Sequence, residues 1–431
     1  MPDFSGASTP DAVIPATLHP SGFALSDSNF YSMSLISDGY IYYTLSSHHI
    51  DTHGRCYRFD PGTDGIEQIF DLGEACGEAG GRTLPQGKSH SPFHEMDGKL
   101  YLATHYGFFA TKDHKEQVAE LPEGYEPYPG GHILEYDLAS GQVADIAQAP
   151  PAEGFITFNV DPQRGRMYCL TWPGGHFLVY DCERGVLENR GQVSRGGEAG
   201  TGNQYFCLCR AFAIYPPTGA VYMTNPDGQV LRHMPGEDTM TPVEGLHLKR
   251  DILGCWDPHQ PGHQGFNWRD IQWHEPSQTF YGVHPKSGWL FHFDPAAERI
   301  ELVERIAAEP LQRSGRWEPF RYGYLTPRFS ADGRTVYYLT GVYDVTGGDG
   351  RHVPTGIHLV TYNLDTRQRT DHGLLRLADG RHPVNTQTLI VHSSGRLFSC
   401  PWIEKPHRAP DDPVRNQCDL ISFADPLAGG A

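Results

Sequence analysis

The sequence has no run of basic residues and no long apolar stretch. Its 34 Lys and Arg residues are outnumbered by 52 Asp and Glu residues, so the 431-residue chain carries a formal net charge of −18 at pH 7. Proteins that bind nucleic-acid duplexes carry a basic patch that neutralises phosphates, and this composition argues against nucleic acid as a partner. No segment approaches the roughly 18 apolar residues of a membrane-spanning helix, so the sequence predicts no membrane partner either.

The N-terminus also lacks the features of a secretory signal. Residues 1–20 contain neither a basic segment nor a continuous apolar core. We therefore expect a soluble cytoplasmic protein, with a secreted protein whose signal has been trimmed as the alternative. The 9 cysteines are scattered and include no CxxC pair, which is typical of reduced structural thiols rather than a disulfide framework.

Turn residues and aromatic rings are abundant. The chain has 49 Gly, 34 Pro, 21 Phe, 7 Trp and 22 Tyr residues. This profile is typical of many short strands joined by tight turns, and it argues against a helical bundle. Histidine is also frequent, with 23 copies, many of which stand beside Gly, Tyr or Trp.

A two-part repeat runs along the chain. Its first part is an alternating segment that closes on a tight turn and ends in Tyr or Phe, which predicts a β-hairpin. It occurs at 31–42, 90–101, 156–168, 210–222, 269–281, 325–337 and 387–398. Its second part typically contains an aromatic residue followed by Asp, which leads into a turn. It occurs at 54–66, 131–143, 175–187, 228–240, 288–300, 357–369 and 417–429.

Seven pairs of hairpins predict an all-β protein, a seven-bladed β-propeller with four antiparallel strands per blade. Residues 31–431 would form this single domain, and residues 1–30 would be an N-terminal extension that covers the surface or adds a closing strand. His132 and His176 follow Gly-Gly pairs at strand starts. We expect both to be structural, with hydrogen bonds between blades, and a place at the channel mouth is the alternative.

In a β-propeller the innermost strand of each blade runs along a central channel. Register therefore places equivalent residues of the repeat around one mouth of this predicted channel. The inner strands would begin at Tyr31, His90, Ile156, Arg210, Arg269, Leu325 and Gln387. The returning strands would end in a second ring of polar and aromatic residues at the same mouth. These are His48, His49, His105, Tyr106, Trp172, Asn225, His284, Tyr343 and Trp402.

The combination of these side chains indicates an acidic sugar as ligand. His90 and His105 stand at the two ends of one hairpin and should lie side by side, with Arg210 and Arg269 across the mouth. Arg binds carboxylates in a bidentate manner, and aromatic rings such as that of Trp172 would stack on pyranose faces, as would Tyr343 and Trp402. Solvated channel lining is the structural alternative.

Three motifs resemble a known family. The run KSHSPFHEMDGKLYLATHYG at 88–107, the PGGH steps at 129–132 and 173–176, and the arginine that opens 210–222 resemble the seven-bladed propeller polysaccharide lyases, chiefly the ulvan lyases. Oligogalacturonate lyase is similar more distantly. The strand pattern extends this resemblance over residues 30–425, whereas the motifs occupy the second to fourth blades, and loops 107–128 and 188–206 depart from the family.

The resemblance implies cleavage of a uronic-acid-containing glycan by β-elimination. His90 and His105 would take the family's histidine positions, and Arg210 would neutralise the uronate carboxylate. Tyr205 is the first choice for the tyrosine, and Tyr106 is the second. This chemistry requires no cofactor, and the implied partner is an acidic oligosaccharide or polysaccharide. We expect Tyr106, Trp172, Asn225, Arg269, His284, Tyr343, Gln387 and Trp402 to contact the substrate.

One segment contains residue types that bind zinc. Cys255, His259 and His263 stand four residues apart, and a structural zinc or another divalent cation is one interpretation. Pro258 and Pro261 exclude a regular helix, so the spacing alone does not bring the three side chains together. A Gly- and Pro-rich surface loop is the alternative interpretation.

Two other function classes stay open. A non-catalytic propeller could bind an acidic glycan or a protein at the same mouth, without convergence of His90, His105 and Arg210. A glycoside hydrolase requires two carboxylates across the bond that it cleaves. Asp270 is the one acidic residue next to an inner-strand start, so this class ranks last.

Overall fold

A computed structural model describes the protein at residues 12–112, 115–118, 120–260, 264–314, 326–344, 353–405 and 416–428. The chain divides into two compact units. Unit 1 comprises Met1–Pro20, Ile252–Gly254 and Arg269–Ala431, and unit 2 comprises Ser21–Asp251 and Cys255–Trp268. The single domain of residues 31–431 stays a prediction.

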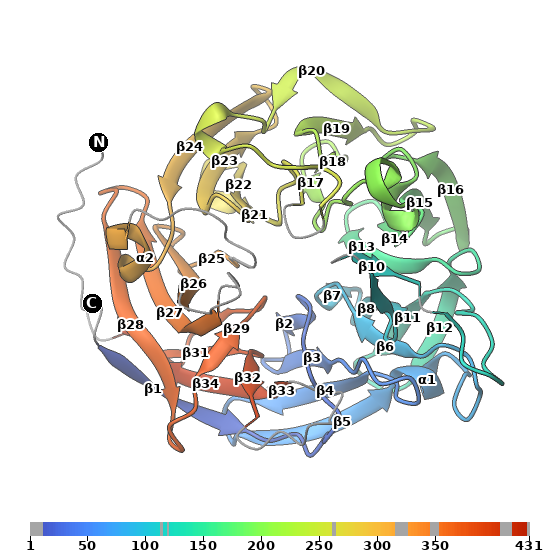
Figure 1. Cartoon of the computed structure of the whole chain (residues 1–431), viewed down its shortest axis with the longest axis horizontal. Coiled ribbons are helices and arrows are strands. Elements are labelled where there is room, and N and C mark those ends of the chain that lie inside the picture. The colour runs from blue at the N-terminus through green and yellow to red at the C-terminus, as the bar shows by residue number, and fades with distance from the viewer. Residues whose placement is uncertain are drawn as a thin grey trace. The chain divides into compact units, whose positions relative to one another are not determined.

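Antiparallel sheets of chain-consecutive strands make up most of unit 2 (Figure 1). The first sheet has the order β2 (Met33–Leu35), β3 (Ile41–Leu45), β4 (Arg55–Asp60), β5 (Gly65–Asp71). The second has the order β12 (Val143–Gln148), β11 (His132–Asp137), β8 (Lys99–Tyr106), β6 (Gln86–Ser89), and β7 (His94–Met96) also pairs with β8.

The third sheet has the order β13 (Gly154–Asp161), β14 (Arg166–Trp172), β15 (His176–Asp181), β16 (Val186–Gln192). The fourth has the order β17 (Ala213–Tyr215), β18 (Ala220–Thr224), β19 (Gln229–His233), β20 (Thr241–His247). A separate two-stranded ribbon pairs β9 (Ala110–Lys112) with β10 (Lys115–Gln117).

Unit 1 continues the same pattern of four consecutive strands. One sheet has the order β21 (Asp270–His274), β22 (Thr279–His284), β23 (Trp289–Asp294), β24 (Arg299–Arg305). An eight-stranded sheet has the order β25 (Arg328–Phe329), β26 (Thr335–Asp344), β27 (Val353–Asn363), β28 (Arg369–Leu377), β1 (Val13–His19), β34 (Leu420–Ala424), β31 (Arg396–Ser399), β30 (Ile390–His392). A smaller sheet pairs β29 (Pro383–Asn385), β32 (Trp402–Glu404) and β33 (Asn416–Cys418).

Strand β1 joins the two ends of the chain within unit 1. It runs parallel to β28, with Val13 opposite Leu374, and antiparallel to β34, with Ala16 opposite Phe423. Residues 13–19 of the predicted N-terminal extension therefore add a strand to a sheet that contains the C-terminal strand.

Helices are short throughout the described residues. They are α1 (Leu72–Ala75), α2 (Glu309–Ser314) and the 3-10 turns η1 (Gly197–Ala199), η2 (Gly202–Gln204), η3 (Asp251–Leu253) and η4 (Glu275–Ser277). Within the described part of the chain, no helix is long and apolar enough to cross a membrane.

Stacked sheets explain the burial pattern of unit 2. Strands β3 and β18 are buried along their whole length, whereas the edge strands β5 and β20 are mostly exposed or half-buried. Strands that are buried on both faces lie between other layers. Side chains of the first and second sheets share one apolar core, and those of the second and third sheets share another. This arrangement is consistent with a β-propeller, and the seven-blade count stays a prediction.

All nine cysteines are free thiols, and six of them are buried. Cys56 and Cys169 belong to the two apolar cores of unit 2. Most of the cysteines therefore occupy buried positions, as expected of structural thiols, and their reduced state stays a prediction.

His132 makes two ionic contacts, one within the second sheet of unit 2 and one with the segment that precedes that sheet. Its Nδ1 lies 2.7 Å from Asp145 Oδ2, and its Nε2 lies 2.9 Å from Glu78 Oε1, in the segment that leads from the first sheet to the second. Burial acts to lower the pKa of His132, but the hydrogen bonds and charges of the two carboxylates outweigh it and raise this pKa to about 9.

The raised pKa predicts a pH-dependent stability. The contribution of His132 is fully present below its ordinary pKa of about 6.5 and is lost as the pH rises through about 9. We expect the thermal unfolding midpoint to decrease as the pH is raised from about 6.5 to about 9. This decrease should be smaller in His132→Gln. His176→Gln is the control, because His176 begins the equivalent strand β15 but lies against the Asn189 amide, 3.3 Å away. Equal pH dependence in wild type and His132→Gln would contradict this assignment.

Candidate functional site

Two neighbouring strands of unit 2 bring His90 and His105 together. Strand β6 ends at Ser89, directly before His90, and β8 carries His105 opposite Lys88 of β6. The centroids of the two imidazole rings lie 5.0 Å apart with their planes at 87°. The predicted side-by-side placement is confirmed, and the catalytic role of the pair stays a prediction.

Glycines allow the backbones to meet at this point. A Cβ added to Gly107 would lie 2.6 Å from the Cα of Gly87 and 2.9 Å from the carbonyl oxygen of Ser47. A Cβ added to Gly154 would lie 2.2 Å from His105 Nδ1. These distances are too short for any side chain without a shift of its neighbours. The glycines of the GKSH and THYG runs are therefore required for close approach.

Aromatic rings enclose the cationic and imidazole groups. Phe30 stacks on His90 with 4.6 Å between ring centroids and an interplanar angle of 14°. The Nζ of Lys88 lies 4.8 Å from the ring centroid of Phe30 and 4.5 Å from that of Phe109. A cation over aromatic faces is stabilised by their quadrupoles. Lys88 is 2% exposed and is a site residue that the repeat did not single out.

Arg210 belongs to a buried ion pair. Its Nη2 donates to Glu198 Oε1 at 2.9 Å and to Oε2 at 3.2 Å, and its Nη1 donates to the carbonyl of Leu208. Glu198 also accepts hydrogen bonds from Trp172 Nε1 and from the backbone N–H of Leu208, each at 2.9 Å. One carboxylate thus orients an arginine and a tryptophan of the predicted site.

Trp172 does not offer an open face for a sugar ring. It is 2% exposed, and its ring makes edge contacts with His105 at 5.5 Å and with Tyr106 at 5.0 Å between centroids. In this structure Trp172 therefore packs behind His105, in contrast to the exposed stacking position that register alone predicts.

A carboxylate–imidazole pair adjoins the cluster. His48 Nδ1 lies 2.8 Å from Asp27 Oδ1, and the backbone N–H of His48 donates to Asp27 Oδ2 at 2.9 Å. Burial acts to raise the pKa of Asp27, but its interactions with His48 and Ser28 outweigh it and leave this pKa below its ordinary value. An ionised Asp27 holds the proton of His48 on Nδ1, as carboxylates do in other imidazole pairs. Phe30 and Phe109 contact the ring of His48 edge-on.

The environment of His105 favours its neutral form. Burial lowers its pKa well below 6.5, and electrostatic interactions with Lys88, Arg210 and His48 lower it further. Its Nδ1 is buried and has no hydrogen-bond partner within the described residues. At neutral pH, the imidazole of His105 is therefore able to accept a proton.

The remaining unit 2 residues of the predicted site are engaged elsewhere or lie in turns. Tyr205 is fully buried, and its carbonyl oxygen lies 2.8 Å from His259 Nδ1. The hydroxyl of Tyr106 donates to the carbonyl of Ala152 at 2.7 Å, and burial raises the pKa of this hydroxyl. Asn225 stands in the turn after β18 and interacts with Gln229, which follows four residues later.

Unit 1 contains the other predicted substrate-binding residues. Arg269 Nη2 donates to Gln387 Oε1 at 3.4 Å, and both residues are buried. His284 is fully buried with its Nδ1 2.8 Å from Ser287 Oγ. Trp402 begins β32 and is half-buried, and Tyr343 lies in β26, where its side chain is outside the described structure.

The predicted zinc site is not supported. Within the described residues, no three His, Cys, Asp or Glu side chains form a group that could hold a metal ion. His259 Nδ1 lies against the Tyr205 carbonyl, Cys255 is exposed, and His263 falls outside the described residues.

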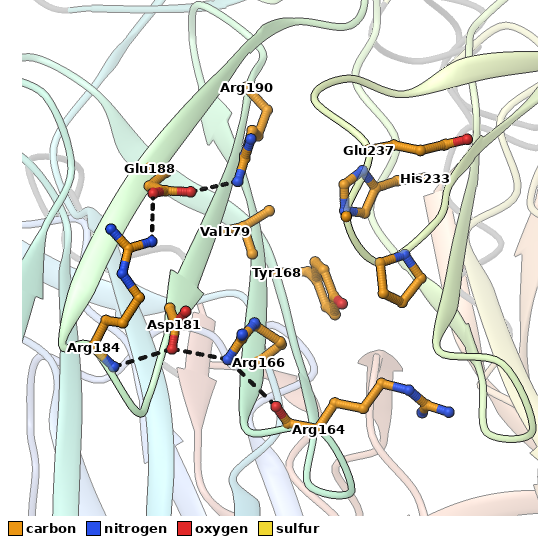
Figure 2. A pocket seen from close by; sticks show the side chains of 12 residues that line it. Arg164, Arg166, Tyr168, Val179, Asp181, Arg184, Glu188, Arg190, His233 and Glu237 are labelled. Atoms are coloured by element: carbon orange, nitrogen blue, oxygen red, sulfur yellow. Dashed lines mark hydrogen bonds and ion pairs between the residues drawn. The ribbon is translucent and has the colours of Figure 1, made fainter.

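A separate pocket of about 400 Å³ lies in unit 2, where the third sheet faces the turn between β19 and β20 (Figure 2). Four arginines line it, together with Asp181, Glu188, Glu237 and His233. The sequence repeat did not indicate this pocket.

Known proteins resemble this chain in fold and not in sequence. No known protein family matches the sequence, and no curated protein matches it. Oligogalacturonate lyase in complex with manganese aligns with a TM-score of 0.53 at 9% identity, over 97% of this chain and 96% of its own. Virginiamycin B lyase from Staphylococcus aureus gives a TM-score of 0.50 at 9% identity, over 95% of this chain and 98% of its own.

A third solved structure is much longer than this chain. The extracellular domain assigned to a hybrid two component system from B. thetaiotaomicron aligns with a TM-score of 0.51 at 12% identity. The alignment covers 95% of this chain but 40% of the longer protein. At these identities the comparisons define the fold class alone, a β-propeller. The predicted similarity to oligogalacturonate lyase is confirmed for the fold, and the resemblance to ulvan lyases stays a prediction.

The contact of Gly154 with His105 predicts a local cost of substitution. In Gly154→Ala the added methyl group meets His105 Nδ1 at 2.2 Å, so we expect the free energy of unfolding to fall by about 1–3 kcal/mol, as for other overpacked sites. Gly62→Ala in an exposed turn is the control, since its nearest neighbour is the Asp60 side chain at 3.2 Å. Urea unfolding measures both variants, and equal stabilities would show that Gly154 does not confine His105.

Proposed function

We propose that this protein is a lyase that cleaves uronic-acid-containing oligosaccharides or polysaccharides by β-elimination. The observation that carries the proposal is the contact of His90 with a neutral, buried His105 beside Lys88 and Arg210. A neutral imidazole is a competent base near neutral pH. Positive charge beside it favours a substrate that carries a carboxylate and an intermediate that carries still more negative charge.

Each step then has a group to perform it. His105 takes the proton from C5 of the uronic acid, and Lys88 and Arg210 stabilise the enediolate that develops at the carboxylate. The electrons form the C4–C5 double bond as the bond from C4 to the glycosidic oxygen breaks. His90 or Tyr205 protonates the leaving oxygen. Electrostatic stabilisation of the enediolate is expected to be the largest single contribution.

The arrangement of the sheets is the second part of the proposal. We infer that the sheets of both units are blades of one seven-bladed propeller, with β1 as the strand that completes the last blade. Support comes from the seven sequence repeats and from the pairing of β1 with β34.

A second function has one observation in its favour. The guanidinium of Arg210 is already paired with Glu198, because its Nη2 lies within hydrogen-bond distance of both buried carboxylate oxygens, which suits a structural arginine as well as a catalytic one. A non-catalytic propeller that binds an acidic glycan or a protein would retain this pair and would not need His105 as a base.

The assay that separates the two functions follows the ultraviolet absorbance of a 4,5-unsaturated uronate. We expect wild type to form this product from uronate oligosaccharides, and His105→Asn to lower kcat by about 10²-fold or more. Arg210→Ala should lower kcat by about 10²–10³-fold. His392→Asn, in strand β30 of unit 1, is the histidine control and should leave kcat unchanged.

The lowered pKa of His105 determines how kcat/KM should depend on pH. The base must be deprotonated, so kcat/KM should stay near its maximum at pH 6, below the ordinary histidine pKa of 6.5. Absence of the unsaturated product with every uronate tested, or full activity of Arg210→Ala, would overturn the lyase proposal and favour the binding function.

A further inference from the structure

Glu198 is a buried carboxylate that the proposed mechanism does not use. It stands in the 3-10 turn η1 and is 2% exposed. Its Oε1 accepts from Arg210 Nη2 and from the backbone N–H of Leu208, each at 2.9 Å. Its Oε2 accepts from Trp172 Nε1 at 2.9 Å and lies 3.2 Å from the same Arg210 nitrogen. Three residues from different parts of unit 2 therefore hold this carboxylate in one position.

The backbone of η1 is fixed to the third sheet. The N–H of Glu198 donates to the carbonyl of Pro173 at 2.7 Å, in the turn between β14 and β15. Gly197 has a φ of +62°, and a Cβ added to it would lie 2.5 Å from the Pro173 oxygen. Only glycine adopts this conformation with so little space. The position of Glu198 is thus built into the fold before any ligand binds.

Glu198 and Leu208 together fix the guanidinium of Arg210. The carbonyl of Leu208 accepts from Arg210 Nη1 at 2.9 Å, while the N–H of Leu208 donates to Glu198. The three residues thereby close a ring of hydrogen bonds that engages both terminal nitrogens of Arg210. Because the guanidinium is already ordered, it loses little conformational freedom when it meets a carboxylate, and the orientation of reacting groups contributes strongly to rate.

The charge of Glu198 also has a cost for binding. A uronate carboxylate that approaches Arg210 shares one positive charge with Glu198, and two carboxylates at one site repel each other. The affinity of the bound uronate is therefore lowered. The enediolate carries more negative charge than the uronate, so its interaction with a fixed guanidinium is stronger. Catalysis benefits from interactions that favour the transition state over the bound substrate.

We propose that Glu198 is a positioning residue for Arg210. It holds the guanidinium in the orientation that the developing enediolate requires, and it weakens binding of the uronate carboxylate in the ground state. This role rests on the proposed lyase function. It predicts that removal of the charge of Glu198 lowers kcat and KM together, whereas loss of a merely structural contact would not tighten binding.

Steady-state kinetics of Glu198→Gln with uronate oligosaccharides test the proposal. We expect kcat to fall by about tenfold or more, because the orientation of Arg210 is lost. KM, and the Kd for D-galacturonate measured by calorimetry, should each fall by about threefold, because the competing charge is absent. Glu198→Asp keeps the charge on a shorter side chain, so its kcat should fall without a fall in KM.

Glu188→Gln is the matched control. Glu188 also pairs with arginines of unit 2, namely Arg184 and Arg190, on the edge strand β16 and its turn. This variant should leave kcat and KM unchanged.

The outcomes separate this role from the lyase function. With an active wild type, an unchanged kcat in Glu198→Gln, or a KM and Kd that rise, would overturn the role of Glu198 alone. If Glu198→Gln does not fold, as judged by its thermal midpoint, a wild-type kcat in Glu198→Asp would overturn it. A wild type that forms no unsaturated product contradicts the lyase function, and the Kd for D-galacturonate then decides whether Glu198 competes at Arg210. No binding of D-galacturonate to wild type would overturn both.

Discussion

The close crossing of three backbone segments is the constraint on which the candidate site depends. Gly87 and Gly107 approach so closely that a Cβ on either would lie within 2.6 Å of the other's Cα, and Ser47 donates its N–H to the Gly87 carbonyl at 2.9 Å. His48, Lys88 and His105 stand one or two residues from this crossing. Three chemically active side chains from the first and second sheets of unit 2 thereby converge in one buried cluster.

Charge compensation is what allows so many ionisable groups to be buried. Burial of an unpaired charge is costly, whereas paired and hydrogen-bonded charges are tolerated. Glu198 compensates Arg210, Asp27 is hydrogen-bonded to His48, and the rings of Phe30 and Phe109 stabilise Lys88. His105 has no carboxylate beside it and avoids the cost by remaining neutral. The same electrostatics that keep the fold stable thus create a base beside positive charge.

Sequence reasoning was most successful where the signal is periodic. Alternating hydrophobicity and Gly turns predicted the strands and their consecutive pairing, because both depend on local backbone conformation. Register alone predicted that His90 and His105, at the two ends of one hairpin, lie side by side. The distance of 5.0 Å between their ring centroids confirms this placement. Glu198 could not be predicted in this way, because it stands in the 3-10 turn η1, outside the repeat. The same holds for Asp27, which precedes the first repeat.

The sequence by itself determined the class of fold and which two histidines meet. The tertiary structure decided which partners surround them: a glutamate that pairs with Arg210, a lysine buried between phenylalanine rings, and a second pocket in which every arginine is paired. Such partners come from segments far apart in the chain. Their contacts depend on how sheets pack and not on any local period, so no pattern within one repeat encodes them.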